Sequence, residues 1–343
     1  MSDVWTGSRA AVHGWTVATA LLTFVLICSG GLVTSHGAGM AVPDWPNTFG
    51  YNMFLFPVSR WVGGVFYEHT HRLIASGVGL MTVILSIALW KTEPRRWVRI
   101  FGYWAVVGVC LQGLLGGLRV VLIKDQIGIL HALLAQSFFI AMALLAIVTS
   151  RNFVEKRWAD YEPHPTLRWW AFGATALIFL QLGLGAAMRH EHIGLSIPDF
   201  PLAYGRWVPD TSADSLQRIN AERLAAGEMA TNAVQIWIQM AHRALGLLIA
   251  VAVLAFSWKV RRRARATRLW SMIWAAMIPA QIGLGAWTVW SNKAADVATA
   301  HVALGALSLL VGALISFRLF LGARTQDFVL PDAPNTSFME RIA

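Results

Sequence analysis

An acid, two imidazoles and a guanidinium follow one another in Glu68-His69-Thr70-His71-Arg72, directly before the apolar segment Leu73 to Trp90. Ionisable side chains beside a membrane-length apolar run are costly to bury, so such residues mark a functional site by default. Imidazole binds metal ions, and a partly desolvated carboxylate is suited to acid–base chemistry. The cluster therefore indicates a reactive or metal-binding site at the head of a membrane helix.

The composition is that of an integral membrane protein. Of the 343 residues, 56% are hydrophobic, only 13% are charged, and 17 are Trp, which lies far outside the range of soluble domains. The formal net charge is +10, but the Lys and Arg residues fall between apolar segments, so a nucleic-acid partner is not expected. Cys28 and Cys110 both lie inside apolar runs, and no disulfide framework is expected.

Eight transmembrane helices are predicted, because about 20 apolar residues are needed to cross a bilayer. The predicted spans are 14–35, 64–90, 97–118, 127–149, 167–188, 234–258, 268–290 and 297–321. Basic residues gather after the second, fourth and sixth spans and near both ends, so the positive-inside rule places these regions in the cytoplasm. The outer connections are long at 36–63 and 189–233, and the polar stretch Ser212 to Thr231 suits a surface helix or a solubilising insertion.

The chain contains an internal repeat. The matched pairs, 155 to 171 residues apart, are Pro43-Asp44-Trp45-Pro46 with Pro198-Asp199-Phe200-Pro201, His71-Arg72 with His242-Arg243, Gln112–Gly117 with Gln281–Gly285, and His131 with His301. We therefore expect an N-terminal half at 1–150, a cytoplasmic linker at 151–166, a C-terminal half at 167–322 and a cytoplasmic tail at 323–343. Halves with an even number of spans share one orientation and are related by a pseudo-two-fold axis along the membrane normal. The expected fold is all-α, with two four-helix bundles.

Each even-numbered span carries one repeat-matched histidine near its outer end. These are His71, His131, His242 and His301. Two inward-facing histidines on neighbouring helices of a bundle form an axial ligand pair for haem iron, so we pair the first with the second and the third with the fourth. The residue four positions later is small in every case: Ala75, Ala135, Gly246 and Gly305. This leaves room for a flat macrocycle, although small residues also serve ordinary helix packing in membranes.

The neighbours of His71 divide by helical geometry. His69 lies about 200° around the helix from His71, so only one of the two faces the bundle interior, and His71 is preferred because it matches His242. His69 is expected to be an interfacial or supporting residue. Arg72 and Arg243 are expected either to bind haem propionates or to snorkel to the interface, and Arg119 has the same two interpretations.

The two halves differ at one informative position. Glu68 stands three residues before His71, whereas Gln239, of nearly the same shape but without an ionisable proton, stands three before His242. Only the N-terminal site can therefore carry out acid–base chemistry with this side chain. The C-terminal pair is expected to hold a fixed electron-transfer or structural haem. A merely structural role for Glu68, anchoring the helix end or hydrogen-bonding His71, remains open.

Taken together, these residues resemble the haem A synthase family. The resemblance rests on Gly30-Gly31-Leu32-Val33-Thr34, Gly37-Ala38-Gly39, the Pro43–Pro46 turn, Glu68 and the four matched histidines, and it spans nearly the whole chain. It implies oxidation of the C8 methyl group of haem O to a formyl group through hydroxylated intermediates, giving haem A for terminal oxidases. It also implies a substrate haem at Glu68, His71 and His131, and a haem b at His242 and His301. The loop cysteines that many members carry are missing from 38–49 and 193–204.

Two other functions are considered. A different di-haem membrane cytochrome, of the quinone or ferric reductase type, would need haems stacked across the membrane, but all four histidines lie toward one face. A parallel-repeat transporter would place polar groups near mid-membrane, where only Gln112, Gln181 and Gln281 are weak candidates. The expected partners are membrane lipid and haem O, with a haem O synthase as the candidate for its delivery and a homo-oligomer as the candidate assembly, and the sequence does not identify the electron acceptor. The short N-terminus without a transit-like segment favours a bacterial plasma membrane, with the haem sites toward the outer face.

Overall fold

The computed structural model describes residues 5–155, 165–261 and 265–326, and these ranges are helical apart from loops and two isolated β-bridges. Eight helices in the described ranges are long and apolar enough to cross a membrane, which confirms the eight predicted spans. They are α1 Gly7–Ser35, α2 Gly63–Thr92, α3 Arg96–Val121, α4 Asp125–Thr149, α6 Pro165–His190, α8 Ala233–Val260, α9 Arg265–Trp290 and α10 Ala295–Gln326. Most of the predicted linker and tail, at 156–164 and 327–343, lies outside the described residues.

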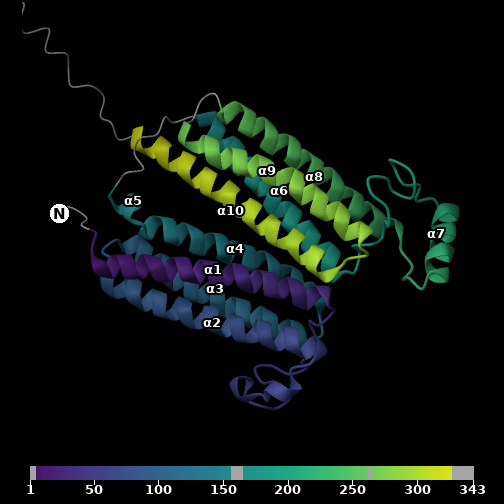
Figure 1. The fold of residues 1–343 in the computed structure, drawn as a ribbon, viewed down its shortest axis with the longest axis horizontal. Helices are drawn as coiled ribbons and strands as arrows, with labels where there is room; N and C mark the ends of the chain where they lie inside the picture. The colour runs from purple at the N-terminus through teal and green to yellow at the C-terminus, as the bar shows by residue number, and fades with distance from the viewer. Residues whose placement is uncertain (1–4, 156–164, 262–264, 327–343) are drawn as a thin grey trace, which may run out of the picture.

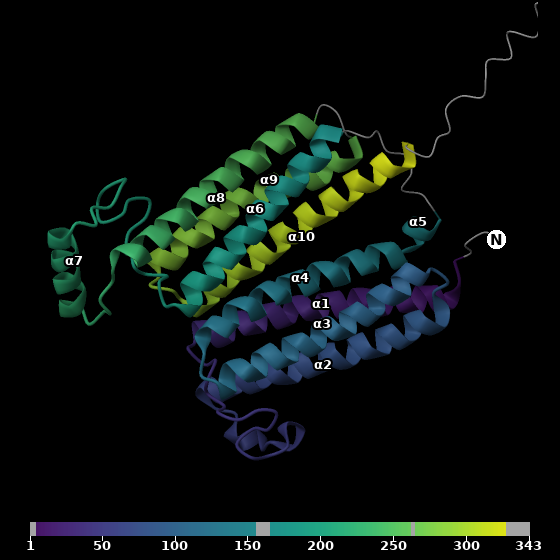
Figure 2. The ribbon, with the colours of Figure 1, turned by 180° about the vertical axis from the view of Figure 1, so that it is seen from behind.

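The eight long helices pack in two groups of four, which is compatible with the expected pair of bundles (Figures 1 and 2). In the first group α1 and α3 each pack against both α2 and α4. In the second group α6 and α9 each pack against both α8 and α10. The groups meet where α1 contacts α10 and where α4 contacts α6 and α10. The order of contacts is the same in both groups, as the sequence repeat requires.

Each helix group has its own apolar core. Val78, Leu85, Leu89 and Met142 are buried in the first group, while Phe256 and Trp274 lie at the centre of the second. A third, smaller core joins the groups through buried Ile27 of α1, Phe139 of α4 and Ala306 of α10. Many large apolar side chains on the outer faces are exposed, as expected for helices surrounded by lipid. The three cores fix the positions of the helix ends that carry the histidines.

The long connections lie at the end of the molecule opposite to the start of α1 and the end of α10 (Figure 1). The first connection contains the short 3₁₀ helices η1 Met53–Leu55 and η2 Val58–Arg60, and the second contains α7 Ala213–Ala225. Residues 213–225 of the polar stretch Ser212 to Thr231 thus form a helix. A further short helix, α5 Arg151–Val154, follows α4 at the opposite end.

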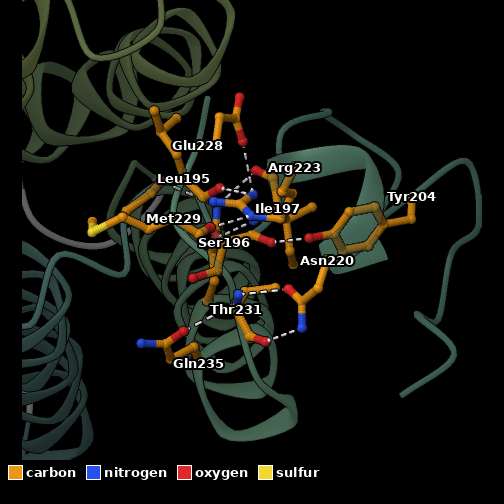
Figure 3. Close-up of polar contacts among 12 residues, drawn as sticks. Leu195, Ser196, Ile197, Tyr204, Asn220, Arg223, Glu228, Met229, Thr231 and Gln235 are labelled. Carbon is orange, nitrogen blue, oxygen red and sulfur yellow. Dashed lines mark hydrogen bonds and ion pairs between the residues drawn. The ribbon is translucent and has the colours of Figure 1, made fainter. Parts of the chain in front are cut away.

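A polar network fastens α7 to the loop that precedes it (Figure 3). Arg223 donates to the carbonyl oxygens of Leu195 and Met229 at 2.9 and 2.8 Å, and it pairs with Glu228 at 3.2 Å. The hydroxyl of Tyr204 donates to the Ser196 carbonyl, and burial raises the pKa of this phenol. The insertion that makes the second connection longer is therefore a folded element that is tied to the mouth of the C-terminal group.

Candidate functional site

The four matched histidines lie on α2, α4, α8 and α10, each near the end that faces the long connections. His131 is close enough to His71 to act on it electrostatically, and His301 is similarly close to His242, while the sharing of one haem by each pair stays a prediction. Within the described residues, neither ring nitrogen of any of the four makes a hydrogen bond, and each Nδ1 is buried without a partner. The protein itself thus leaves these nitrogens free for a ligand.

Each histidine ring packs against a glycine on the preceding long helix. A methyl group built on Gly30 would lie 3.0 Å from Cε1 of His71, and one built on Gly285 would lie 3.1 Å from Cε1 of His301. The corresponding distances are 3.4 Å for Gly116 with His131 and for Gly185 with His242. A methyl group would therefore crowd the rings of His71 and His301, whereas it would make an ordinary contact with those of His131 and His242. Sequence reasoning missed these contacts, because it considered only the positions four residues after each histidine.

Three of the four helices that carry these glycines also carry a glutamine whose amide donates to the backbone of the facing histidine. Nε2 of Gln112, Gln181 and Gln281 donates to the backbone carbonyl of His131, His242 and His301 at 3.2, 2.9 and 3.0 Å, respectively. Each glutamine stands four residues before its glycine, so the signal Gln-x-x-x-Gly was present in the sequence in three copies.

The amides also approach some of the small residues on the histidine helices. A methyl group on Gly246 would lie 3.5 Å from Nε2 of Gln181, and one on Gly305 would lie 3.3 Å from Nε2 of Gln281. At Gly246 this is an ordinary contact distance, whereas at Gly305 the methyl group would also lie 3.0 Å from Cδ2 of Leu182, so only the second position is crowded. Space for a macrocycle beside them, as expected from the sequence, stays a prediction.

Glu68 is buried, with 4% of its surface exposed, and both of its oxygens have partners. Oε2 accepts the Val42 N–H at 2.9 Å, and Oε1 pairs with Nη2 of Arg72 at 2.6 Å. The same Arg72 nitrogen donates to the Val42 carbonyl at 3.0 Å, while Nη1 donates to the carbonyls of Asp44 and Asn47. Glu68 and Arg72 together hold the first outer loop against α2.

Gln239 occupies the equivalent place in the second group. Its Oε1 accepts the Ile197 N–H at 2.8 Å, and its Nε2 donates to the Ile197 carbonyl at 3.3 Å. Arg243 donates to the carbonyls of Asp199 and Leu202, and it lies over the ring of Phe200. Since Arg72 and Arg243 both bind loop carbonyls here, their expected role toward haem propionates stays a prediction.

The Pro-Asp-aromatic-Pro turns form the same structure in both outer loops. Asp44 accepts the N–H groups of Phe49 and Gly50, both at 2.8 Å, and Asp199 accepts those of Tyr204 and Gly205. Burial alone would raise the pKa of Asp44, but these two N–H groups and the charge of Arg72 hold it below its ordinary value. In the first loop, the structural repeat therefore extends past the matched Pro-Asp-aromatic-Pro sequence to about residue 51.

The aromatic residue of each turn contacts a helix of its own group. Trp45 covers Gly117 of α3, where an added methyl group would collide with the indole. The ring of Phe200 meets that of Trp290, at the end of α9, edge to face at 6.2 Å. Each loop thus reaches from the histidine helix across to the third helix of its group.

His69 is fully buried on the side of α2 away from His71. Its Nδ1 lies 3.2 Å from the Thr48 hydroxyl, and its ring packs against Phe56 and Trp61 at 5.1 and 4.7 Å. It therefore supports the first outer loop, as the helical rotation indicates, although it lies in a packed interior and not at an open interface.

Several polar residues at the helix ends join the two groups. Arg189 of α6 donates to the Gly31 carbonyl and the Ser35 hydroxyl of α1. The ring of His190 packs on Gly128 of α4, which has no side chain to obstruct it. Arg119 pairs with Asp125 at 2.8 Å and covers Gly39 of the first loop. Of these contacts, the hydrogen bonds of Arg189 and the packing of His190 cross between the two groups, whereas the Arg119–Asp125 pair lies within the first group.

The comparisons with known proteins agree with this geometry. The family model described as cytochrome oxidase assembly protein matches residues 13–314. A haem A synthase of Lysinibacillus sphaericus is 27% identical over 321 residues, which cover 91% of this chain and 95% of the relative. Haem A synthases of Geobacillus kaustophilus (26% identical, covering 90% of each chain) and Shouchella clausii (27% identical, covering 71% of this chain and 75% of the relative) also match. The chain is a multi-pass membrane protein that belongs to the cytochrome oxidase assembly protein family, the family of the haem A synthases.

Proposed function

We propose that this protein oxidises the C8 methyl group of haem O to the formyl group of haem A, with the reaction in the N-terminal group of helices. The observation that carries this proposal is the set of four repeat-matched histidines whose ring nitrogens the protein leaves free, with a carboxylate beside only one pair. Membership of the haem A synthase family supports the same reaction. This family membership does not favour a quinone or ferric reductase cytochrome, or a parallel-repeat transporter.

The residues present suit haem in both groups. Two imidazoles from facing helices are a common axial pair for haem iron, and here neither ring is engaged in another hydrogen bond within the described residues. The glycine behind each ring allows the preceding long helix to pack closely against the helix that carries the histidine. We assign His71 and His131 to the substrate haem O, and His242 and His301 to haem b. When bound, haem b supplies one-electron redox chemistry.

The N-terminal group is the reactive one because Glu68 is the ionisable member of the pair Glu68 and Gln239. Conversion of a methyl to a formyl group is an oxidation that releases protons, so a proton acceptor near the substrate assists it. Oε1 of Glu68 is held by Arg72 and Oε2 by the Val42 N–H, so the carboxylate is fixed in position beside His71 on the same helix. We assign proton uptake to Glu68 and its orientation to Arg72.

The orientation in the membrane follows from charge. The start of α1 and the end of α10 lie at one end of the molecule, together with the basic connections after α2 and α4 (Figure 1). By the positive-inside rule this end faces the cytoplasm of a bacterial plasma membrane, and the histidine sites lie toward the outer face. Haem O would reach the site within the membrane, for instance from a haem O synthase, and assembly into a homo-oligomer is compatible with this arrangement.

The direct test is to purify the full-length protein, extract its pigments and identify them by chromatography and mass spectrometry. Haem b together with haem O, haem A or a hydroxylated intermediate is the expected result. A colourless preparation from cells that make haem O would contradict the proposal, as would haem b alone in two equal sites.

A further inference from the structure

The backbone carbonyls of three of the four histidines accept a hydrogen bond from a side chain on the preceding long helix. Within the described residues, the carbonyl of His71 accepts none from a side chain. The amides of Gln112, Gln181 and Gln281 bind the carbonyls of the other three histidines. The position that corresponds to Gln181 in the repeat is Leu26, because both stand four residues before the glycine that packs on the histidine ring, Gly185 or Gly30. No side chain in the described part of the chain donates to the His71 carbonyl.

Leu26 does lie on the inner face of α1, so the difference is not caused by a change in helix rotation. It packs against the apolar core of the first group, together with Leu22 and buried Val78 of α2. A leucine has nearly the volume of a glutamine but neither donates nor accepts a hydrogen bond. At this position α1 and α2 are thus held together by apolar packing, whereas α6 and α8 are also joined by a directional bond.

The three buried glutamines lower the stability of the protein unless their hydrogen bonds to the histidine carbonyls have a function. In each of them Oε1 is buried without a hydrogen-bond partner, so every amide uses only part of its hydrogen-bonding capacity. A buried polar atom without a partner destabilises a protein, more so in a membrane than near water. Leu26 shows that the same place in the fold can be filled without this cost. The benefit must therefore come from the bond to the histidine carbonyl, which limits the movement of that turn.

We propose that Leu26 makes His71 the releasable ligand, so that the haem of the N-terminal group is exchanged while that of the C-terminal group, tied at both histidines, is retained. This inference rests on the proposed function, in which one haem is a substrate that must enter and leave. In the N-terminal group Gln112 still holds the turn of His131. The product would leave by opening on the α2 side, with His131 as the fixed ligand.

The test compares rates of haem loss from the purified full-length protein to an excess of apomyoglobin, a haem scavenger. The captured haem is identified by mass, so that haem O or haem A from one site is distinguished from haem b from the other. We expect L26Q to slow the loss of haem O and haem A by about two- to tenfold, the effect of one hydrogen bond. L26M, which preserves the apolar packing, is the matched control and is expected to match the parent protein.

The reverse substitution gives an independent result if L26Q does not fold. Q181L is expected to increase the rate of haem b loss by about two- to tenfold and to raise the fraction of haem b that binds added cyanide, a measure of axial-ligand release. Unchanged rates in both L26Q and Q181L, in proteins that still contain both haems, would overturn the inference alone. Proteins without any haem O, haem A or haem b would instead overturn the proposed function.

Discussion

Glu68 and Arg72 form an ion pair one helical turn apart, with Oε1 and Nη2 separated by 2.6 Å, and together they bind both backbone groups of Val42. In the other half Gln239 alone binds both backbone groups of Ile197, the residue equivalent to Val42. Glu68 and Arg72 together therefore make the two backbone contacts that Gln239 makes alone in the other half. The second half shows that a neutral amide can hold this position of the loop, whereas in the first half the carboxylate also pairs with the charge of Arg72.

This equivalence makes Glu68→Gln an unusually clean test of the acid. Gln at position 68 can accept the Val42 N–H and donate to the Val42 carbonyl, as Gln239 does for Ile197, so the loop is expected to keep its structure. We predict that E68Q retains haem b and lowers the formation of haem A by about 10²- to 10⁴-fold, the usual contribution of a general acid or base. The measurement is the ratio of haem A to haem O in extracted pigments. Haem A at the parental level in E68Q would remove Glu68 from the mechanism.

Gln239→Glu is the matched control in the second half. It introduces a carboxylate in the same geometry, near Arg243, but far from the proposed reaction. Haem A formation is therefore expected to stay within about twofold of the parent protein, provided that haem b is retained, because no assigned proton transfer involves this site. A loss in Q239E as large as that in E68Q would show that any change of charge at a loop anchor is harmful, and would leave Glu68 without a specific role.

The histidine pairs predict which haem is lost in each variant. We expect H242A and H301A to lose haem b, and H71A and H131A to retain haem b but lose haem O and haem A, because the two pairs lie on separate groups of helices. The measurement is the pigment content per protein, with the reduced-minus-oxidised absorption spectrum as a second readout. Loss of both haems from H71A and H131A, in protein that remains folded, would contradict the separate sites.

The sequence predicted the eight spans, which the structure confirms, and the internal repeat, because both depend on hydropathy or on residue identity at a fixed spacing; the pairing of the histidines on haem stays a prediction. It did not predict the close contacts. Gly30 and Gly285 matter through the ring that faces each of them on another helix, and Leu26 matters only by contrast with Gln181. Such relationships depend on the rotation of one helix against its neighbour. Several apolar faces on these helices are similar, so hydropathy alone does not determine that rotation.

The glycine contacts predict a graded response to alanine. A methyl group at position 30 would meet Cε1 of His71 at 3.0 Å, well inside ordinary carbon–carbon contact, whereas one at position 116 would meet Cε1 of His131 at 3.4 Å. We expect G30A to displace the His71 ring and to reduce the haem O and haem A content by more than half. G116A is expected to have the smaller effect, since a shift of a few tenths of an ångström relieves the contact.

The comparison of G30A with G116A is made on purified protein with haem b as the internal standard, since neither glycine lies in the second group. Equal losses from the two variants would show that a general helix-packing effect, and not crowding of the histidine ring, determines haem content at this site. A retained haem b signal in both confirms that the protein is folded.

The first outer loop is expected to loosen in acid because of Asp44. The N–H groups of Phe49 and Gly50 and the charge of Arg72 keep the pKa of Asp44 below its ordinary value, despite the opposing effect of burial. A lowered pKa in the folded loop means that the carboxylate's contribution to stability is complete above the ordinary pKa, about 4. The contribution is lost as the pH falls through the lower, folded value. Hydrogen exchange at residues 44–51 should therefore increase at the lowest pH values relative to a free peptide.

Asp44→Asn separates this effect from general acid damage. The N–H groups of Phe49 and Gly50 bind different oxygens of Asp44, and Asn replaces one of these oxygens by an NH2 donor. D44N is therefore expected to destabilise the loop by about 1 kcal/mol at neutral pH and to abolish its acid dependence. D199N, which changes the matching turn of the second loop, is the control and should leave exchange at residues 44–51 unchanged. An acid-induced increase of the same size in D44N as in the parent protein would show that another group controls the loop.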